Sequence, residues 1–400
     1  MADLLIELYS EEIPAGMQGG AADQLHRKIS EFLAAFGVAA DTMESHVSPQ
    51  RLALIATGLP QNLPNRQEQK KGPRVDAPEK AIEGFLRANG LGSTGGLSVQ
   101  EDKRGAFFVL EIDEKGGALA DDLAAFMPAM IEGFQWPKSM RWGSGSLRWV
   151  RPLRSILCVF DGQPVPFNVG GIESGSETYG HRFMAPDAIT ITDPHDYVGA
   201  LDKAHVLVDA AVREAMIVES STALATGVDC DLVEDAELIS ETAGLVEWPV
   251  PLLGQIDAEF MDVPEEVLIS VMRTHQKYFA LRDRSGKLAP YFITISNMEA
   301  DDKGAAIIAG NERVLRARLS DGRFFWDQDR KETLLSRLPS LEKITFQAKL
   351  GTVADKAERI AALAAELAPA LSADKKTAQK AAQLCKADLV SGMVYEFPEL

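Results

Sequence analysis

Apolar and polar positions in the first sixty residues follow two different spacings, which together predict an α/β unit. The compact apolar runs Leu4–Tyr9 and Arg51–Thr57 are typical of buried strands. Between them, apolar side chains recur at helical spacing over residues 22–36, and Gly37 follows where such a helix would end. We therefore expect a strand, a helix and a second strand in this order.

The pattern beyond this unit predicts a chain of mixed helices and strands. Gln61–Pro78 is polar and contains several prolines, which is typical of a linker or a long loop. The Gly-, Ser- and Thr-rich segment 167–191 indicates short strands. Helices are expected over 78–89, 119–134, 200–227 and 264–278, and strands or extended segments over 107–112, 155–160, 245–254 and 291–296.

After about Pro339 the pattern becomes helical throughout. Apolar residues recur in steps of four and three from Phe346 to Leu367, and a second helical stripe runs from Ala378 to Leu389. This pattern indicates the start of an all-helical domain, and we expect that domain to be cut at Leu400. The predicted fold class is therefore α+β and multidomain, with a mixed α/β body before the helical part. The expected parts are residues 1–60, 61–175, 176–338 and 339–400.

Charge and cysteine content narrow the class of protein. The net charge of −18 argues against a protein that coats nucleic acid, although it leaves room for a selective RNA binder with local basic patches. The cysteines Cys158, Cys230 and Cys385 are far apart and each has apolar neighbours, so we expect buried thiols in a reducing cytoplasm. Neither a signal peptide nor a membrane-spanning apolar run is recognisable, which predicts a soluble cytoplasmic protein.

The segment Val263–Arg330 interleaves basic and aromatic side chains within this acidic chain. Guanidinium groups pair with phosphates and aromatic rings stack on bases, so the segment is a candidate RNA-contacting surface. The alternative is a structural helix whose arginines pair with nearby carboxylates, with Val314, Leu315 and Leu319 as its apolar face. The candidate contacts are Arg273, His275, Lys277, Arg313, Arg316 and Arg323.

Two further clusters also combine basic and aromatic side chains, and they are weaker candidates for RNA contact. Arg141, Arg148, Arg151 and Arg154 surround Trp142 and Trp149, and Arg182 stands beside His181 and Tyr179. Each cluster is compatible with RNA contact or with an internal structural network.

The sequence contains no convincing catalytic motif. The chain has no P-loop, no GxSxG and no HExxH motif. The dipeptide His195-Asp196 is the ligand pair of metal phosphohydrolases, but it lacks the further histidines of such a site, so we interpret it as the start of a helix. The adjacent Glu11 and Glu12 would point to opposite sides of an extended segment, which favours a turn or capping role.

Seven long motifs occur in order along the chain. They are LLIELYSEEIPAGM at Leu4–Met17, SPQRLAL at Ser48–Leu54, MRWGSGSLRWVRPLRSIL at Met140–Leu157, TYGHRFM at Thr178–Met184, LVEWPVPLLGQID at Leu245–Asp257, the segment Val263–Lys331, and LCKADLVSGMVYEFPEL at Leu384–Leu400. With these motifs, the chain resembles the beta subunit of the bacterial-type, two-subunit glycyl-tRNA synthetase over essentially its whole length.

The resemblance implies a class II aminoacyl-tRNA synthetase of two alpha and two beta subunits, which joins glycine to its tRNA with ATP. The alpha subunit would hold the catalytic core with the ATP, Mg and glycine sites, and the beta subunit would recognise tRNA. This chain would then contain no catalytic residue, cofactor or metal, and would contact neither DNA nor membrane. Family members are longer and continue through an HD-like helical domain, so we expect the start of that domain after residue 339.

Two competing functions remain at this point. The chain could be a metal-dependent phosphohydrolase of the HD type, or a purely structural subunit that never touches RNA. Bound divalent metal would distinguish the first, and salt-dependent tRNA binding would argue against the second.

Overall fold

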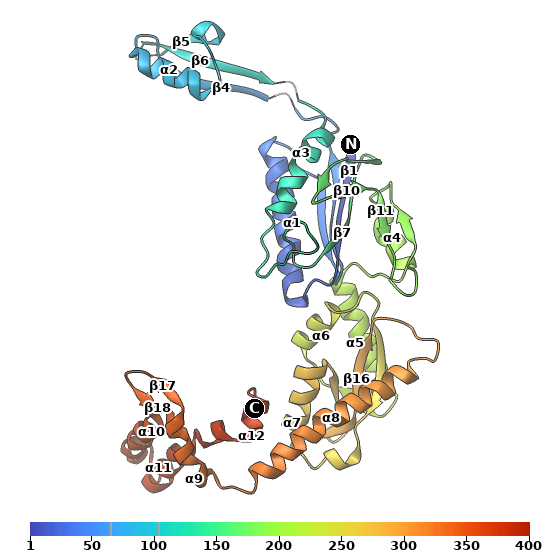
Figure 1. Cartoon of the computed structure of the whole chain (residues 1–400), viewed down its shortest axis with the longest axis vertical. Helices are drawn as coiled ribbons and strands as arrows, with labels where there is room; N and C mark the ends of the chain where they lie inside the picture. Colours follow the sequence, from blue (N-terminus) through green and yellow to red (C-terminus); the bar gives the residue numbers. More distant parts are fainter. Residues whose placement is uncertain (65, 103–104, 115) are drawn as a thin grey trace. The chain divides into compact units, whose positions relative to one another are not determined.

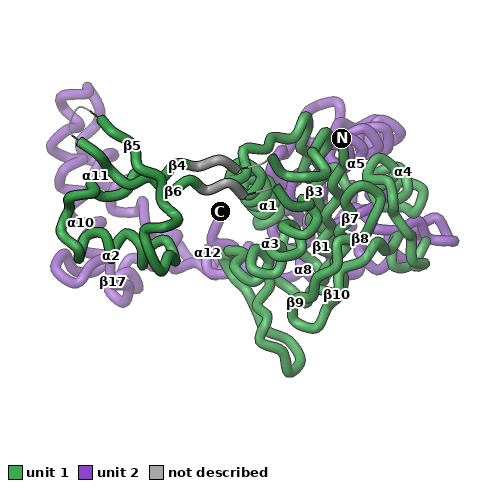
Figure 2. Tube along the Cα trace, turned by 90° about the horizontal axis from the view of Figure 1, so that it is seen from above, with its two compact units in different colours: residues 1–210 green, residues 211–400 purple. Residues whose placement is uncertain are grey.

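The computed structural model describes residues 1–64, 66–102, 105–114 and 116–400. These residues form two compact units, Met1–Ala210 and Ala211–Leu400, shown in green and purple in Figure 2. The fold is mixed in helix and strand and has more than one domain, as the sequence predicts. The finer division into four parts stays a prediction.

A seven-stranded sheet forms the centre of unit 1. Its strands follow the order β2-β3-β1-β7-β10-β9, and β8 pairs with β7. They are β1 (Ala2–Ser10), β2 (Thr42–Val47), β3 (Arg51–Leu59), β7 (Leu153–Phe160), β8 (Gln163–Pro164), β9 (Asn168–Val169) and β10 (Ile172–Gly175). The central strand β1 pairs antiparallel with β3 and β7 on either side. The predicted strands at residues 4–9, 51–57 and 155–160 are confirmed.

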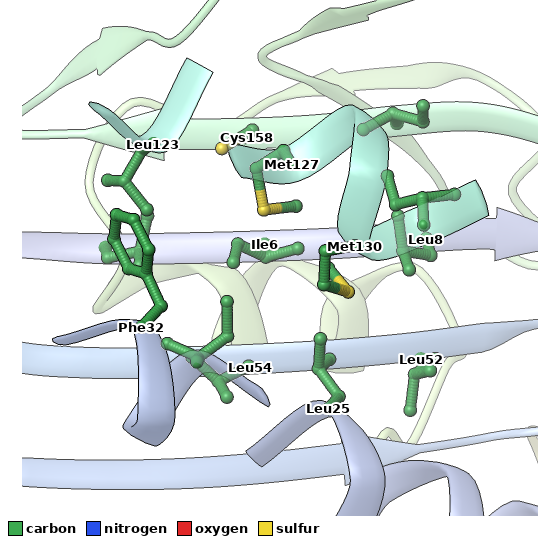
Figure 3. Close-up of a cluster of buried hydrophobic side chains, with 14 of the residues drawn as sticks. Ile6, Leu8, Leu25, Phe32, Leu52, Leu54, Leu123, Met127, Met130 and Cys158 are labelled. Carbon is green, nitrogen blue, oxygen red and sulfur yellow. The ribbon is translucent and has the colours of Figure 1, made fainter. Parts of the chain in front are cut away.

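Side chains of β1 alternate between the two faces of this sheet, as the two-residue period of a strand requires. Ile6 and Leu8 face the helices α1 (Ala15–Ala35) and α3 (Leu119–Glu132), where they pack with residues such as Phe32 (Figure 3). Leu5 belongs to a different buried cluster, which includes Tyr197 and Leu201 of α4 (Asp196–Lys203). Both faces of β1 are therefore covered, which explains its nearly unbroken apolar sequence.

The segment expected to be a linker contains a strand, so that prediction is wrong. Strand β4 (Arg66–Arg74) pairs with β6 (Gly105–Glu114), which also pairs with β5 (Ser98–Asp102). The Nζ atom of Lys71 lies 3.8 Å from the ring centre of Phe107, so the long polar side chain covers an apolar ring. The polar sequence of β4 did not show the apolar alternation typical of a strand, because long polar side chains such as that of Lys71 cover the apolar residues here. Figure 1 shows the three strands beside α2 (Glu79–Ala88), which follows the predicted helix closely.

The last part of unit 1 adds short elements, as its Gly-, Ser- and Thr-rich sequence predicts. The strands β11 (Glu177–Tyr179) and β12 (Ala188–Thr190) pair antiparallel before α4 begins. The predicted helical region 200–227 contains the end of α4 and all of α5 (Ala210–Thr226), a separate helix that lies almost wholly in unit 2.

Unit 2 is built on a four-stranded antiparallel sheet in the order β13-β15-β16-β14. Its strands are β13 (Cys230–Leu232), β14 (Val250–Gln255), β15 (Phe279–Asp283) and β16 (Leu288–Ser296). Helices of this unit include α6 (Ala236–Ala243), α7 (Glu265–Ser270) and the long α8 (Ala305–Asp329). The predicted helix 264–278 is confirmed only in its first half, because residues 271–276 form a π-helical turn, labelled η3, and Lys277 is left-handed with φ of 57°.

The C-terminal part is helical apart from one small hairpin. Its elements are α9 (Leu334–Arg337), η4 (Leu338–Lys343), β17 (Thr345–Gln347), β18 (Gly351–Thr352), α10 (Val353–Leu367), η5 (Ala368–Leu371), α11 (Lys375–Leu384), η6 (Ala387–Val390) and α12 (Gly392–Glu396). The helix predicted from Phe346 begins only at Val353. Gly351 has φ of 86°, which interrupts a helix, and Thr352 with Asp355 forms a capping box that starts one.

Two further expectations concern thiols and membranes. Cys158 and Cys230 are buried as predicted, but Cys385 is exposed at the end of α11, so its predicted burial is wrong. Among the described residues, none of the helices combines the length and apolar character that a bilayer crossing requires.

Candidate functional site

The first candidate surface lies in unit 2, on η3 and α8. Arg273 of η3 donates to Asp235 Oδ2 at 2.6 Å and to Glu237 Oε2 at 2.7 Å. Lys277 Nζ lies 2.9 Å from Glu241 Oε1. All three carboxylates belong to α6 or to its N-cap residue. Arg273 of η3 and Lys277, which follows η3, therefore hold α6 in place.

The π-helical turn explains this arrangement. A π turn inserts an extra residue into a helix, and the left-handed Lys277 ends that helix and leads into β15. His275 is exposed on the turn, and its ring meets Phe397 edge to face at 5.8 Å between ring centres. His275 is thus placed against an apolar ring and remains accessible from solvent.

On α8, the two candidate arginines nearest η2 (Ala258–Phe260) pair with acidic residues of that turn or its N-cap. Arg316 donates both Nε and Nη2 to the carboxylate of Asp257. Arg323 donates to the backbone carbonyl of Glu259 at 2.5 Å and lies 3.5 Å from the carboxylate of the same residue. Arg323 also lies 3.9 Å from Asp327 Oδ2, one turn further along the same helix.

The electrostatics agree with internal pairing. The hydrogen bond from Arg316 holds the pKa of Asp257 below its usual value of 3.8, and the same bond raises the pKa of the guanidinium. Within the described ranges, Arg313 has no ion-pair partner and stands on the exposed side of α8. Four of the six first-rank candidates, Arg273, Lys277, Arg316 and Arg323, are thus engaged with carboxylates, which favours a structural role for them.

The apolar face of α8 differs from the predicted one in a single position. Leu315 and Leu319 are buried against the cluster that contains Val267 and Phe292. Val314 remains 45% exposed, because adjacent residues of a helix point about 100° apart and Leu315 takes the buried direction. The expected inclusion of Val314 in that face is therefore wrong.

The second candidate cluster lies in unit 1, in the loop between α3 and β7. Arg148 donates through Nε and Nη2 to the hydroxyl of Ser139 at 3.3 Å and 3.2 Å, and Arg151 donates to the carbonyl of Val150 at 2.8 Å. Arg141 is exposed, as is Arg154, which lies 3.5 Å from Glu11 Oε1. Arg148 and Arg151 thus contact neutral oxygen atoms, whereas Arg154, at the start of β7, contacts a carboxylate.

The third cluster is tied to the sheet of unit 1. Arg182 lies 3.2 Å from Glu11 Oε2 and 3.1 Å from Glu12 Oε1, so these glutamates serve as ion-pair partners. His181 is buried, and its Nδ1 accepts from the backbone N–H groups of Phe183 and Met184 at 3.3 Å each. The structural interpretation therefore fits His181, while Arg182 remains partly exposed.

A buried polar cluster beneath this region was missed by the sequence interpretation. The carboxylate of Glu7 accepts from the hydroxyls of Thr178 and Tyr197, each at 2.6 Å, and lies 3.3 Å from Arg51 Nε. Arg51 also donates to the carbonyl of Tyr179. The signal was present, because Glu7 interrupts the otherwise apolar strand β1. Three of the seven motifs thus converge on one buried ion pair.

The dipeptide expected to start a helix does so. His195 precedes the first residue of α4, and its Nε2 lies 3.1 Å from Asp3 Oδ2. Within the part of the chain that the structure describes, His, Cys, Asp and Glu side chains form no group of three or more suited to a metal ion.

Comparison with known proteins decides the family. The family model described as glycyl-tRNA synthetase beta subunit matches residues 4–400. The chain belongs to the glycyl-tRNA synthetase beta subunit family.

Its relatives support this assignment at high identity. Glycine–tRNA ligase beta subunits of Phenylobacterium zucineum, Rhodospirillum centenum and a Ruegeria species are 50%, 46% and 46% identical to it. Each alignment covers 100% of this chain and 59–60% of the relative. The chain therefore spans about 60% of the length of the curated relatives that it matches.

Proposed function

We propose that this chain recognises tRNA as the non-catalytic beta subunit of glycine–tRNA ligase, a class II aminoacyl-tRNA synthetase. In this role it is needed for the ATP-dependent attachment of glycine to its tRNA by an alpha subunit. The observation that carries the proposal is the family match over residues 4–400. The relatives at 46–50% identity are named as beta subunits of the same ligase.

The partners follow from this role. The chain acts in the cytoplasm within a heterotetramer of two alpha and two beta subunits, and ATP and Mg bind to the alpha subunit. The helical part after residue 339 is the start of an HD-like domain. The absence of a metal-binding group among the described residues supports tRNA recognition over the HD-type phosphohydrolase.

The tRNA contacts belong to the exposed candidates. Arg141, Arg148, Arg313 and His275 have the accessibility that phosphate or ribose contact requires, whereas Arg273, Lys277, Arg316 and Arg323 stabilise unit 2. Arg151 and Arg182 lie between these groups, because Arg151 is only partly exposed and Arg182 is exposed but paired with Glu11 and Glu12.

Direct binding tests the proposal. Fluorescence anisotropy with a labelled glycine tRNA, at several salt concentrations, should show affinity that falls steeply as salt rises. The chain is used as its gene encodes it, alone and with the alpha subunit. If neither form binds tRNA, the proposed function is wrong. Phosphatase activity that depends on added Mn²⁺, Fe²⁺ or Zn²⁺ would instead support the phosphohydrolase.

A further inference from the structure

The loop between α3 and β7 has an unusual charge. It spans residues 136–152 and is called the tryptophan loop here. It contains four cationic residues, Lys138, Arg141, Arg148 and Arg151, and Arg154 follows at the start of β7. No Asp or Glu occurs from residue 133 to residue 160, although 59 of the 400 residues in the chain are acidic. The loop is therefore a local positive region in a chain of net charge −18.

Aromatic packing fixes both ends of the tryptophan loop. Trp149 is fully buried, with its ring centre 5.1 Å from that of Phe134 and 5.0 Å from that of Trp136. The backbones of Met140 and Trp149 exchange hydrogen bonds of 2.8 Å and 3.2 Å. These contacts join the ends of the loop to the core of unit 1.

Helix α1 adds a second anchor just before the loop. The amide of Gln24, which is largely buried, donates to the carbonyl of Gln135 at 2.9 Å and accepts from its N–H at 3.0 Å. A loop that is fixed in this way loses little conformational entropy when a ligand binds.

The cations of the tryptophan loop are available to an anion. Arg148 is held by the Ser139 hydroxyl, a neutral acceptor. Across the described residues, Arg141 and Lys138 have no carboxylate within ion-pair distance. By contrast, Arg273 on η3 would have to leave two carboxylates before it could bind a phosphate. Binding at the loop therefore breaks no existing charge pair at these three positions.

The tip of the loop permits close approach. Residues 143–146 read Gly-Ser-Gly-Ser, all are exposed, and Gly143 has φ of 56°, a conformation that favours glycine. Because it has no large side chains, this tip exposes serine hydroxyls and backbone groups to a ligand. Of its tryptophans, Trp149 is buried and Trp136 and Trp142 are partly covered, so the loop offers cations rather than an open stacking surface.

We propose that the tryptophan loop binds the sugar–phosphate backbone of tRNA through Lys138, Arg141 and Arg148, without reading the base sequence. This inference rests on the proposed function and names the surface that carries it. A rigid positive loop on an acidic chain orients a polyanion, because the rest of the surface repels it.

The test compares salt dependence in matched variants. The triple variant Lys138→Ala/Arg141→Ala/Arg148→Ala is titrated against a fluorescein-labelled glycine tRNA and against a tRNA of different sequence. Each lost phosphate contact should lower the slope of log affinity against log salt by about 1. We expect affinity to fall about tenfold or more at about 0.1 M salt, to a similar extent for both tRNAs.

Two controls separate charge from folding. Arg27→Ala removes an exposed arginine of α1 in the same unit and should leave both slope and affinity unchanged. Arg141→Lys/Arg148→Lys retains the charges and should keep most of the slope. Thermal unfolding of every variant should match that of the parent, since the substituted side chains are exposed or half-exposed.

The outcomes are distinguishable. If the parent binds with steep salt dependence and the triple variant binds within about twofold with the same slope, the loop inference is overturned and the proposed function stands. If the triple variant no longer binds the alpha subunit but keeps its affinity for tRNA, the loop contacts the alpha subunit instead of tRNA and the inference is also overturned. If the parent itself shows no salt-dependent binding, the proposed function fails and the inference fails with it.

Discussion

Glu7 and Arg51 form an ion pair, with 3.3 Å between Oε2 and Nε, although both side chains lie in the interior of unit 1. The exposed fractions are 0% for Glu7 and 1% for Arg51, so water contributes almost nothing to their solvation. The hydroxyls of Thr178 and Tyr197 complete the environment of the carboxylate. The pair thereby fastens the segment after β10 to the central sheet.

Removing one partner of this pair should be costly. Glu7→Met or Arg51→Met leaves the other charge buried and uncompensated, and should lower the free energy of unfolding by about 3–5 kcal/mol. The double variant should lose clearly less than the sum of the two, because no lone charge remains. Urea unfolding of the parent and the three variants measures this coupling, and purely additive losses would contradict it.

Gly180 is a second constraint in the same region. A Cβ atom there would lie 2.3 Å from the carbonyl oxygen of Ala185 and 2.7 Å from Cβ of Ala204. Gly180→Ala should therefore destabilise the protein by about 1–3 kcal/mol. Gly199→Ala in α4 is the matched control, because no atom lies within 4 Å of its added Cβ. Calorimetry should show a lowered Tm for the first variant only.

Asp235 links helix capping to pH. Its carboxylate accepts from Leu238 N–H at 3.0 Å and from Arg273. Burial alone would raise its pKa, but the hydrogen bonds from Arg273 and Leu238 outweigh burial and lower the pKa below 3.8. A carboxyl group with a lowered folded pKa stabilises the fold above its unfolded pKa, and this contribution disappears as pH falls through the folded value.

Asp235→Ala should accordingly lower the free energy of unfolding at pH 7 by about 1–2 kcal/mol. The difference from the parent should shrink as the pH falls below 3.8, where the native carboxyl becomes protonated. Urea midpoints measured from neutral to acidic pH check the trend. A difference that stays constant over the whole range would show that the carboxylate charge is irrelevant.

The three cysteines should differ in reactivity. Burial raises the pKa of Cys158 to about 12 and also raises that of Cys230, whereas Cys385 is exposed. The thiolate is the reactive form, so an aromatic disulfide reagent at mildly alkaline pH should titrate Cys385 rapidly and the other two only after unfolding. Cys385→Ser should abolish the rapid phase. Rapid reaction of a second thiol in the native protein would contradict the observed burial.

The sequence predicted elements whose pattern arises from local burial. Residues 4–9 form a central strand whose apolar positions are buried on both faces, and residues 119–132 form a helix whose apolar positions face one core. Prediction from the sequence failed where an element depends on pairing or packing with residues far away in the chain. The polar strand β4 is recognised as a strand only when its pairing with β6 is known. The start of α10 depended on Thr352 and Gly351, whose local chemistry was visible but outweighed by the apolar spacing from Phe346.

The candidate site shows the same limit. The sequence indicates where cations gather, but it does not indicate which carboxylates reach them. Arg273 and Asp235 are 38 positions apart, and only folding shows their pairing. The absence of acidic residues around Arg141 and Arg148 was readable from the sequence, and it identifies the cations that remain available.

The rate of glycine attachment to tRNA by the alpha subunit should be measured with and without this gene product. If the chain is the tRNA-recognising beta subunit, charging requires its addition, while ATP-dependent activation of glycine by the alpha subunit does not. The proposed function is wrong if the alpha subunit alone charges tRNA at the full rate, or if the pair does not charge it at all.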